Sequence, residues 1–303
     1  MYDLLVIGAG PAGLTAAVYG MRAGLTVLVL EEGVAGGQLT LTAEVENYPS
    51  WPKISGWELA SRIAEQAAAS GAEIRYEPAV SLAVLPDGTK EVATAAGGRY
   101  GARAVIVAGG ARRRKLECPG EERLTGRGVS YCAVCDGAFF RDRTVCVVGG
   151  GNTALEDALY LAKVCKKVYL IHRRDAFRGE QRLRSAVTAS EKIEILWNTA
   201  VAAVEGEERV EAVELTGAHA GTLPVDGVFV AIGLVPDNSR FAGVLETDGV
   251  GYLRAGEDCR TNVPGVFAAG DCRTKEIRQI LTAAADGAVA ATLAAAGLNA
   301  EAR

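Results

Sequence analysis

The chain of 303 residues is long enough for two domains of ordinary size, with hydrophobic cores that need no disulfide bonds. Apolar residues make up 49% and charged residues 23%, a composition typical of a folded globular protein. The net charge is −5, and the one basic run, at residues 112–115, is short. This charge excludes the basic surface that nucleic-acid binding requires, so we expect no nucleic acid as a partner.

The sequence predicts neither a membrane segment nor a metal site. No stretch reaches about 18 uninterrupted apolar residues, and the N-terminus lacks the basic region of a signal peptide. We therefore expect a cytoplasmic protein with no membrane partner. Seven cysteines, an odd number, suit a reducing compartment better than a disulfide framework. With two histidines and a single Cys-x-x-Cys pair, we expect no metal.

The chain begins with the pattern of a βαβ unit. Apolar runs at residues 4–7 and 27–30 flank a helical segment at residues 14–23. The turn before the helix has three glycines in the pattern G-x-G-x-x-G: Gly8, Gly10 and Gly13. Such a turn lets the backbone approach a pyrophosphate at the helix N-terminus, and Glu31 after the second strand suits a ribose hydroxyl. This pattern predicts a dinucleotide site.

A second unit of the same kind lies later in the chain. Apolar runs at residues 145–148 and 168–171 flank another helical segment at residues 155–162. The turn before this helix has the pattern G-x-G-x-x-A and supplies four candidate cofactor contacts: Gly149, Gly151, Asn152 and Thr153. The duplication predicts two nucleotide-binding domains in one chain.

The second unit differs from the first at the end of its second strand. The acid is replaced by a histidine and a cluster of arginines: His172, Arg173, Arg174 and Arg178. An acid accepts a hydrogen bond from a ribose 2′-hydroxyl, whereas arginines pair with a 2′-phosphate. The second site is therefore predicted to bind NADPH in preference to NADH. The first site, which suits a 2′-hydroxyl, fits FAD, and the second site, which suits a 2′-phosphate, fits NADPH.

Cys132 and Cys135 form a Cys-x-x-Cys pair that is followed by Asp136. Two sulfurs at this spacing can form a reversible disulfide. Half of a zinc site and two buried small residues are the alternatives, and the missing second pair and the adjacent acid weigh against them. We interpret the pair as an electron relay. The other cysteines have no partner spacing and are interpreted as packing residues: Cys118, Cys146, Cys165, Cys259 and Cys272.

Motifs along essentially the whole chain resemble the low-molecular-weight bacterial thioredoxin reductase family. They lie, in chain order, at residues 8–13, 36–38, 46–49, 132–137, 149–154, 172–178, 270–271 and 278–279. The resemblance implies an α/β fold with two Rossmann-like dinucleotide-binding domains, the NADPH domain being inserted into the FAD domain. Residues 1–111 and 239–303 would form the FAD domain, and residues 112–238 the NADPH domain with its redox cysteines.

The resemblance also implies a role for individual residues. Asp271 would hold the ribityl chain of FAD, and further FAD contacts would come from Gln38, Asn47, Gly270, Arg278 and Gln279. Cys135 would exchange electrons with the flavin, Cys132 would attack a protein disulfide, and Asp136 would act as the acid or base. The sequence departs from the family pattern at Ser50, Gly109 and Ile280.

The function that the resemblance implies is an NADPH-dependent thioredoxin-disulfide reductase, which works as a homodimer. Electrons would pass from NADPH through FAD and the Cys132–Cys135 disulfide to oxidised thioredoxin or a thioredoxin-like protein. Phe139 and Phe140, just past the cysteines, would contact that partner; the alternative is that both pack in the core of the NADPH domain. The alternatives are a flavin dithiol oxidase, a ferredoxin-dependent disulfide reductase and a non-catalytic redox sensor. The arginines after the second strand weigh against the first two, and the retained cysteines against the third.

Overall fold

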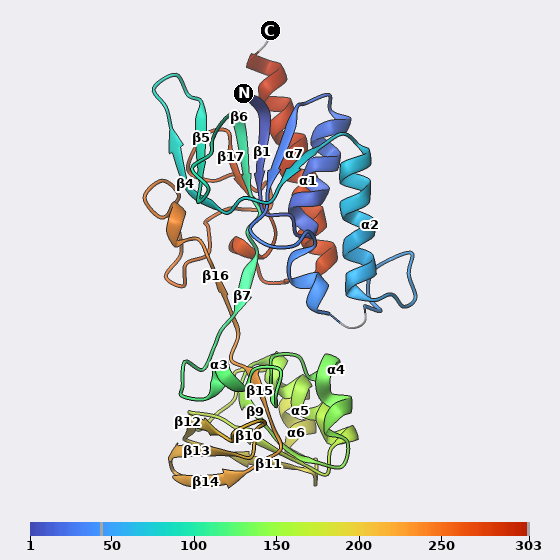
Figure 1. Ribbon diagram of the computed structural model, residues 1–303, viewed down its shortest axis with the longest axis vertical. Coiled ribbons are helices and arrows are strands. Elements are labelled where there is room, and N and C mark those ends of the chain that lie inside the picture. Colours follow the sequence, from blue (N-terminus) through green and yellow to red (C-terminus); the bar gives the residue numbers. More distant parts are fainter. Residues whose placement is uncertain (43–44, 302–303) are drawn as a thin grey trace. The chain divides into compact units, whose positions relative to one another are not determined.

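The computed structural model describes residues 1–42 and 45–301, except for the side chains of Leu41, Cys135 and Glu301. The described chain forms two compact units, each with its own largely parallel sheet (Figure 1). The α/β fold with two parallel sheets that the repeated glycine motifs predict is confirmed.

Unit 1 comprises Met1–Arg112 and Val235–Arg303, and unit 2 comprises Arg113–Leu234, so unit 2 is an insertion within unit 1. The two crossings lie on β7 (Ala111–Arg113) and β16 (Leu234–Pro236), which pair as a two-stranded sheet. The sequence predicts boundaries after residues 111 and 238. The structure places the first crossing one residue later and the second four residues earlier.

Unit 1 is built on a seven-stranded sheet in the order β3-β2-β1-β6-β5-β4, with β17 paired to β6. Neighbours among β3, β2, β1, β6 and β17 are parallel, whereas β5 and β4 are antiparallel. The strands are β1 (Tyr2–Ile7), β2 (Val27–Leu30), β3 (Glu73–Arg75), β4 (Ala79–Val84), β5 (Lys90–Thr94), β6 (Arg99–Val107) and β17 (Val266–Ala268). The helices are α1 (Pro11–Arg22), α2 (Gly56–Ala69) and α7 (Ile280–Glu301), and Figure 1 shows them on one side of this sheet.

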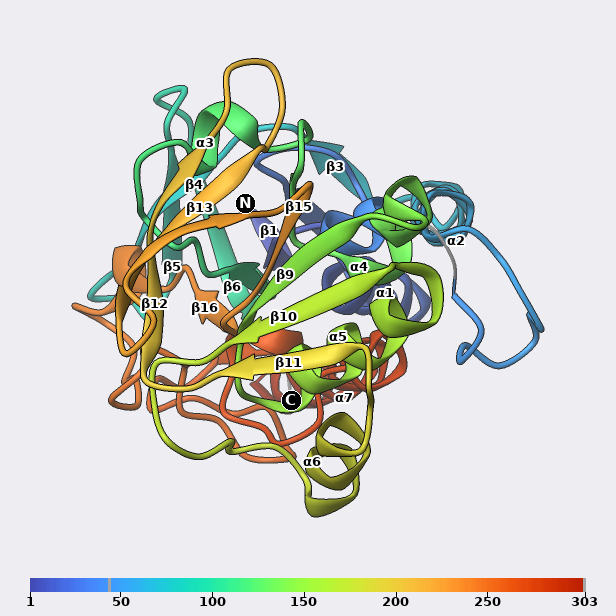
Figure 2. The same cartoon turned by 90° about the horizontal axis from the view of Figure 1, so that it is seen from below.

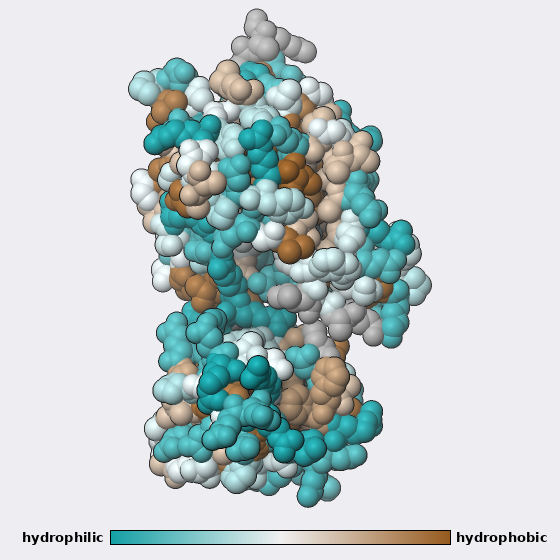
Figure 3. Space-filling view, viewed as in Figure 1, coloured by the Kyte–Doolittle hydropathy of each residue, from teal (hydrophilic) through white to brown (hydrophobic). Residues whose placement is uncertain are grey.

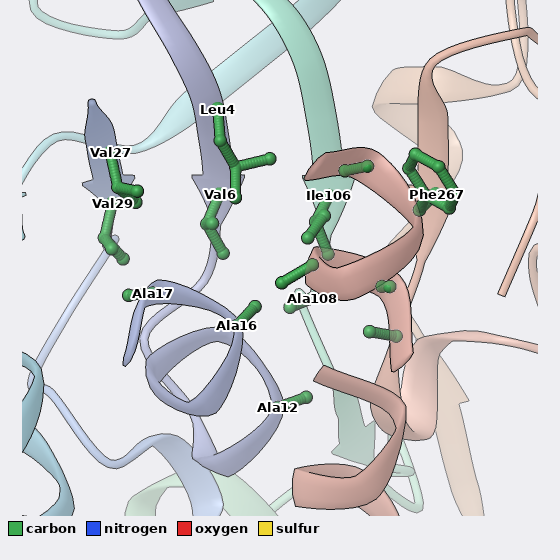
Figure 4. Close-up of a cluster of buried hydrophobic side chains, with 14 of the residues drawn as sticks. Leu4, Val6, Ala12, Ala16, Ala17, Val27, Val29, Ile106, Ala108 and Phe267 are labelled. Carbon is green, nitrogen blue, oxygen red and sulfur yellow. The ribbon is translucent and has the colours of Figure 1, made fainter. Parts of the chain in front are cut away.

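The alternation of side chains along β1 divides the core of unit 1 into two layers. Leu4 and Val6 pack in one cluster with α1 and α7, whereas Leu5 and Ile7 pack in a second cluster on the other face. Figure 4 shows the first cluster, in which small alanines of α1 such as Ala16 meet the larger side chains of the strands. Because these alanine side chains are small, α1 lies close to the sheet. This close packing determines the position of the glycine turn that connects β1 to α1.

Unit 2 has a five-stranded parallel sheet in the order β11-β10-β9-β15-β8 and a three-stranded antiparallel sheet, β12-β13-β14. Figure 2 shows β9, β10 and β11 side by side with α5 next to them. The parallel strands are β8 (Val129–Ser130), β9 (Thr144–Gly149), β10 (Lys167–Ile171), β11 (Ile193–Leu196) and β15 (Gly227–Ala231). The antiparallel strands are β12 (Thr199–Glu205), β13 (Ala212–Gly217) and β14 (Gly221–Pro224). The helices are α3 (Glu121–Leu124), α4 (Ala133–Asp136), α5 (Asn152–Val164) and α6 (Gln181–Thr188).

The C-terminal helix α7 is apolar because it packs in the core of unit 1. By length and composition, the segment Ile280–Ala300 could cross a membrane, but 44% of its most apolar window is buried inside the protein. Gly287 lies against α1 so closely that a Cβ atom there would be 2.0 Å from the carbonyl oxygen of Ala12. Asp286, a buried acid of α7, forms ion pairs with Arg273 and Lys275 of the same unit. These contacts are those of a core helix.

Candidate active site

The first glycine turn, in unit 1, has the geometry of an anion-binding turn. Gly8 adopts a φ of 103°, which favours glycine, and a Cβ atom at Gly13 would lie 1.8 Å from the carbonyl oxygen of Gly8. Gly10 caps the 12-residue helix α1 without any side-chain hydrogen bond, and a Cβ atom there would meet nothing within 4 Å. The first N–H groups of α1 therefore face open space, where a pyrophosphate can bind.

Glu31 organises this turn. Its Oε2 accepts a hydrogen bond from the backbone N–H of Ala9 (2.6 Å), and its Oε1 accepts one from the N–H of Gly33 (2.8 Å). Gly36 donates its N–H to the carbonyl oxygen of Ala9 (2.7 Å), which draws the following loop against the turn. Each carboxylate oxygen keeps a further lone pair, so Glu31 can hold the turn and still accept from a ribose hydroxyl.

A half-buried acid with one unpartnered oxygen lies at the Gly270–Cys272 turn of unit 1. Among the described side chains, Oδ1 of Asp271 is one of two buried polar atoms that have no hydrogen bond. Burial raises the pKa of Asp271, although Lys275 and Arg278 oppose that shift. An unsatisfied buried acceptor costs about 1–3 kcal/mol, which a ligand hydroxyl would recover. The unpartnered oxygen and the open helix N-terminus both fit FAD.

The other predicted FAD contacts also lie in unit 1, and two pairs of them are in contact. The side-chain amide of Asn47 donates to Oε1 of Gln279 (3.0 Å). Arg278 donates from Nε to the backbone oxygen of Asp271 at the long distance of 3.4 Å. The guanidinium of Arg278 also lies 4.0 Å from the centre of the Tyr252 ring. Gln38 is exposed at the turn Gly37–Leu41.

A charge network that the sequence did not predict connects the Gly270–Cys272 turn to α7. Oδ2 of Asp286 accepts hydrogen bonds from the backbone N–H of Gly270, from Nε of Arg273 and from Nζ of Lys275, each at 2.8 Å. Both cations and the acid are buried. Burial opposes ionisation of Asp286, but the hydrogen bonds from Arg273 and Lys275 hold the pKa of its carboxyl below its usual value. A lone acid within an alanine-rich helix is the signal that could have revealed the network.

The variant Asp286→Ala is expected to lower the free energy of unfolding by about 3–5 kcal/mol, because it removes the buried carboxylate that Arg273 and Lys275 share. The stabilisation by Asp286 is fully present above a pH of about 4, the pKa of an aspartate in the unfolded chain. It is lost as the pH falls through the lower pKa that Asp286 has in the folded protein. Denaturant titration of the protein at pH 7 measures the change. The exposed Thr292→Ala on α7 serves as the control, with an expected change within about 0.5 kcal/mol. Equal stabilities of the two variants would contradict this role of Asp286.

The second glycine turn, in unit 2, has the same design as the first. Gly151 caps the 13-residue helix α5 without a side-chain hydrogen bond, and a Cβ atom there would meet nothing within 4 Å. Ala154 is fully buried where the third glycine of the first motif stands. Asn152 and Thr153, in the first turn of α5, are exposed, although the Asn152 amide donates to Glu180. The N-terminus of α5 is therefore open for a second pyrophosphate.

The loop after β10 folds back onto this glycine turn. Arg178 donates its backbone N–H to the carbonyl oxygen of Gly150 (2.8 Å). His172 is buried beside Gly150, and its Nε2 lies 3.1 Å from the carbonyl oxygen of Ala176. Burial lowers the pKa of His172, which favours the neutral ring. These contacts of His172 stabilise the loop that follows β10.

Three arginines of this loop are exposed: Arg173, Arg174 and Arg178. Within the described part of the chain, no carboxylate forms an ion pair with any of them. Unpaired guanidinium groups beside an open helix N-terminus are the chemistry that recognises a phosphate. The residues of unit 2 therefore fit NADPH.

The cysteine motif lies directly after β8, within unit 2. Cys132 is disulfide-bonded, whereas the side chain of Cys135 lies outside the described part of the structure. Asp136 donates its backbone N–H to the carbonyl oxygen of Cys132 (3.1 Å), so a single helical turn, α4, closes over the motif. The five remaining cysteines are free, as expected for packing residues: Cys118, Cys146, Cys165, Cys259 and Cys272.

A cavity of about 300 Å³ opens beside Asp136. Asp136, Ser130 and Phe139 line it, together with the cationic side chains Arg127, Arg143 and Arg209 and the carboxylate of Asp226. Phe139 is 82% exposed. On the face shown in Figure 3, hydrophobic side chains gather over α4.

The expectation that both phenylalanines are exposed is wrong for Phe140. Phe140 is partly buried in the core of unit 2, where its ring meets Phe229 edge-on with 5.3 Å between centroids. A Cβ atom at Gly227 would lie 2.4 Å from the Phe140 ring, so the glycine provides the space that the ring fills. Consecutive residues of a tight turn point in different directions, and only one of the two aromatic rings therefore reaches solvent.

Comparison with known proteins gives one consistent result. Residues 2–287 match the family described as pyridine nucleotide-disulphide oxidoreductase. The thioredoxin reductase of Listeria innocua is 47% identical over 96% of this chain and 92% of its own, and that of Bacillus subtilis is 43% identical over 96% and 93%. The crystal structure of Lactococcus lactis thioredoxin reductase, 40% identical, has a TM-score of 0.82 and covers 97% of this chain and 98% of its own.

The chain belongs to the pyridine nucleotide-disulphide oxidoreductase family. It is a flavoprotein disulfide reductase, and its fold is that of two Rossmann-like dinucleotide-binding domains. Within the family, the predicted resemblance to bacterial thioredoxin reductases is confirmed. The predictions of an NADPH-dependent enzyme and of FAD and NADPH as its cofactors are confirmed with it.

Proposed function

We propose that this protein reduces the disulfide of thioredoxin with electrons from NADPH, which pass through FAD and a Cys132–Cys135 disulfide. One observation carries the proposal. In the sheet of unit 2, β8 and β9 both lie parallel to β15, so their carboxyl ends share one edge. The cysteine motif follows β8 and the second glycine turn follows β9 at that edge. The proposed redox disulfide and the proposed nicotinamide site would therefore share one edge of one sheet.

We assign FAD to unit 1 and NADPH to unit 2. In unit 1, Gly8, Gly10, Gly13 and Glu31 would hold the pyrophosphate and ribose at the open end of α1. Asp271 would accept from the ribityl chain, since its buried Oδ1 lacks a donor. The remaining FAD contacts would come from Gln38, Asn47, Gly270, Arg278 and Gln279. When bound, FAD supplies a two-electron carrier between the nicotinamide and the disulfide.

In unit 2, the second glycine turn and the loop after β10 would hold NADPH. The pyrophosphate would bind at the N-terminus of α5, at Gly149, Gly151, Asn152 and Thr153. The three exposed arginines would pair with the 2′-phosphate: Arg173, Arg174 and Arg178. His172 would keep the loop folded against the turn.

The thiol chemistry would be performed by three residues. The thiolate of Cys132 attacks one sulfur of the thioredoxin disulfide, whose S–S bond breaks as a mixed disulfide forms. The departing thiolate takes a proton, which Asp136 is placed to supply. Cys135 then loses its thiol proton and attacks Cys132 Sγ, and the second thioredoxin sulfur leaves and takes that proton. The Cys132–Cys135 disulfide has then formed again, and reduced thioredoxin leaves with two electrons and two protons.

The thioredoxin is proposed to dock over α4, around the exposed ring of Phe139, because its disulfide must reach Cys132. The variant Phe139→Ala is expected to raise the KM for thioredoxin by about 30-fold, the equivalent of about 2 kcal/mol for one aromatic anchor. Turnover with a small aromatic disulfide and the melting temperature should hardly change. Phe140→Ala is the matched control, and it should lower the melting temperature instead because Phe140 packs in the core. An unchanged KM in Phe139→Ala would place the docking surface elsewhere.

We further propose that the enzyme works as a homodimer in the cytoplasm. The resemblance to bacterial thioredoxin reductases favours this. Sedimentation equilibrium of the FAD-loaded protein measures the first point directly, with a mass of twice 31.5 kDa expected before bound cofactor is added.

Steady-state oxidation of NADPH with and without oxidised thioredoxin tests the proposed function. Turnover is expected only when thioredoxin is present, with one thioredoxin disulfide reduced for each NADPH oxidised. A flavin dithiol oxidase would instead consume oxygen without thioredoxin. A ferredoxin-dependent reductase would be inactive with NADPH and active with reduced ferredoxin.

A further inference from the structure

Ser130, the last residue of β8, connects the attacking cysteine to the neighbouring acid. It is 5% exposed, and its hydroxyl is enclosed by the turn that follows. Ser130 Oγ lies 2.5 Å from Oδ2 of Asp136, 3.1 Å from the backbone nitrogen of Cys132 and 3.3 Å from the backbone oxygen of Cys132. One hydroxyl therefore contacts the side chain of Asp136 and the backbone of Cys132, two of the three residues that the proposed thiol chemistry uses.

The hydroxyl has a single proton, and the distances decide where that proton lies. A hydroxyl donates to a carboxylate at 2.5–2.7 Å, which matches the separation of Ser130 Oγ from Asp136. The separation of 3.3 Å from the oxygen of Cys132 is too long to compete. Ser130 therefore donates to Asp136, and a lone pair of Oγ accepts the N–H of Cys132.

The hydrogen bonds form a closed ring through the redox motif. Ser130 holds the carboxylate of Asp136 and the N–H of Cys132, while the N–H of Asp136 donates to the carbonyl oxygen of Cys132 (3.1 Å). The ring contains no sulfur atom. It can therefore persist when the disulfide opens and closes, and it keeps Cys132 and Asp136 in a constant relation.

We infer that Ser130 is a positioning residue for thiol–disulfide exchange, acting through Asp136 and the backbone of Cys132. The inference rests on the proposed function, in which Cys132 attacks and Asp136 supplies a proton to the departing thiolate. Misplacing a reacting group by about 1 Å can slow a reaction about 100-fold. The hydroxyl would maintain that geometry without itself reacting.

Several other charges face Asp136, so Ser130 is not its only influence. The charge of Arg113, on β7, acts on Asp136 and on Asp157 of α5. The cavity beside Asp136 adds three cations and one carboxylate: Arg127, Arg143, Arg209 and Asp226. For this reason the test uses rate constants at one pH and a double-variant comparison, instead of a pH profile.

The variant Ser130→Ala is expected to lower kcat for thioredoxin about 10- to 100-fold, with KM changed less than about 2-fold. The anaerobic reduction of bound flavin by NADPH should keep its rate. Ser130→Thr, which retains the hydroxyl, should recover most of the lost kcat. Thr199→Val is the matched control, since it removes another buried hydroxyl of unit 2, which donates to the carbonyl oxygen of Trp197.

The double variant Ser130→Ala/Asp136→Asn separates positioning from a loss of packing. If Ser130 acts in part through Asp136, the serine substitution should lower kcat by a clearly smaller factor once Asp136 has been replaced than it does in the wild-type protein. Independent, multiplying losses would overturn the inference, as would an unchanged kcat in Ser130→Ala. A fall in melting temperature with the same rate loss in Ser130→Thr would also overturn it. If the wild-type protein does not reduce thioredoxin, the proposed function fails, and the same variants are then compared with a small aromatic disulfide.

Discussion

Replacing either Cys132 or Cys135 by serine abolishes the reduction of thioredoxin and leaves the reduction of bound flavin by NADPH intact. This is the expected result because the complete thiol exchange needs both sulfurs, whereas hydride transfer to the flavin precedes any reaction of sulfur. Stopped-flow absorbance of the flavin and a thioredoxin assay measure the two halves separately.

Cys118→Ser is the matched control for the cysteine variants. Cys118 is a free, half-buried cysteine of the same unit, and burial raises the pKa of its thiol. A thiol held in its neutral form is a poor nucleophile, so this variant should keep full turnover. Residual thioredoxin reduction in Cys132→Ser or Cys135→Ser would rule out the proposed relay.

The kcat/KM for NADPH is expected to exceed that for NADH by at least about 100-fold, from charge-assisted pairing of exposed arginines with the 2′-phosphate. Replacing Arg173, Arg174 and Arg178 together by alanine should remove most of this preference by lowering kcat/KM for NADPH alone. Arg182→Ala, an exposed arginine of α6, is the matched control. Equal efficiencies of the two cofactors in the wild-type protein would contradict the assignment of the second site.

The two glycine turns were predictable from the sequence because their chemistry dictates residue type and spacing together. A Cβ atom at Gly13 would overlap the oxygen of Gly8, so few other sequences can form that turn. The insertion of the second unit into the first was an expectation from the resemblance to the thioredoxin reductase family, because the glycine motifs alone predict two units and not their connection. The second boundary of unit 2, after Leu234, was less predictable from the sequence. It lies within β16, a connecting strand whose pairing with β7 the sequence does not indicate.

Interactions between residues distant in sequence were not predictable in the same way. Asp286 pairs with Arg273 and Lys275 only because α7 folds over the Gly270–Cys272 turn. Ser130 looks like an ordinary strand residue until the helical turn of α4 brings Asp136 back to it. The pattern also gave no reason to distinguish Phe139 from Phe140, since the space that accepts the Phe140 ring is provided by Gly227 of another strand.

An anaerobic titration with NADPH tests the central claim most directly, namely that electrons pass through both FAD and the cysteine pair. The wild-type protein should oxidise two equivalents of NADPH per bound flavin, counted after unreacted NADPH has been removed. One equivalent reduces the flavin and the other reduces the disulfide. Cys132→Ser and Cys135→Ser should each consume one equivalent. Consumption of a single equivalent by the wild-type protein would contradict the account, because the disulfide would then not receive electrons from NADPH.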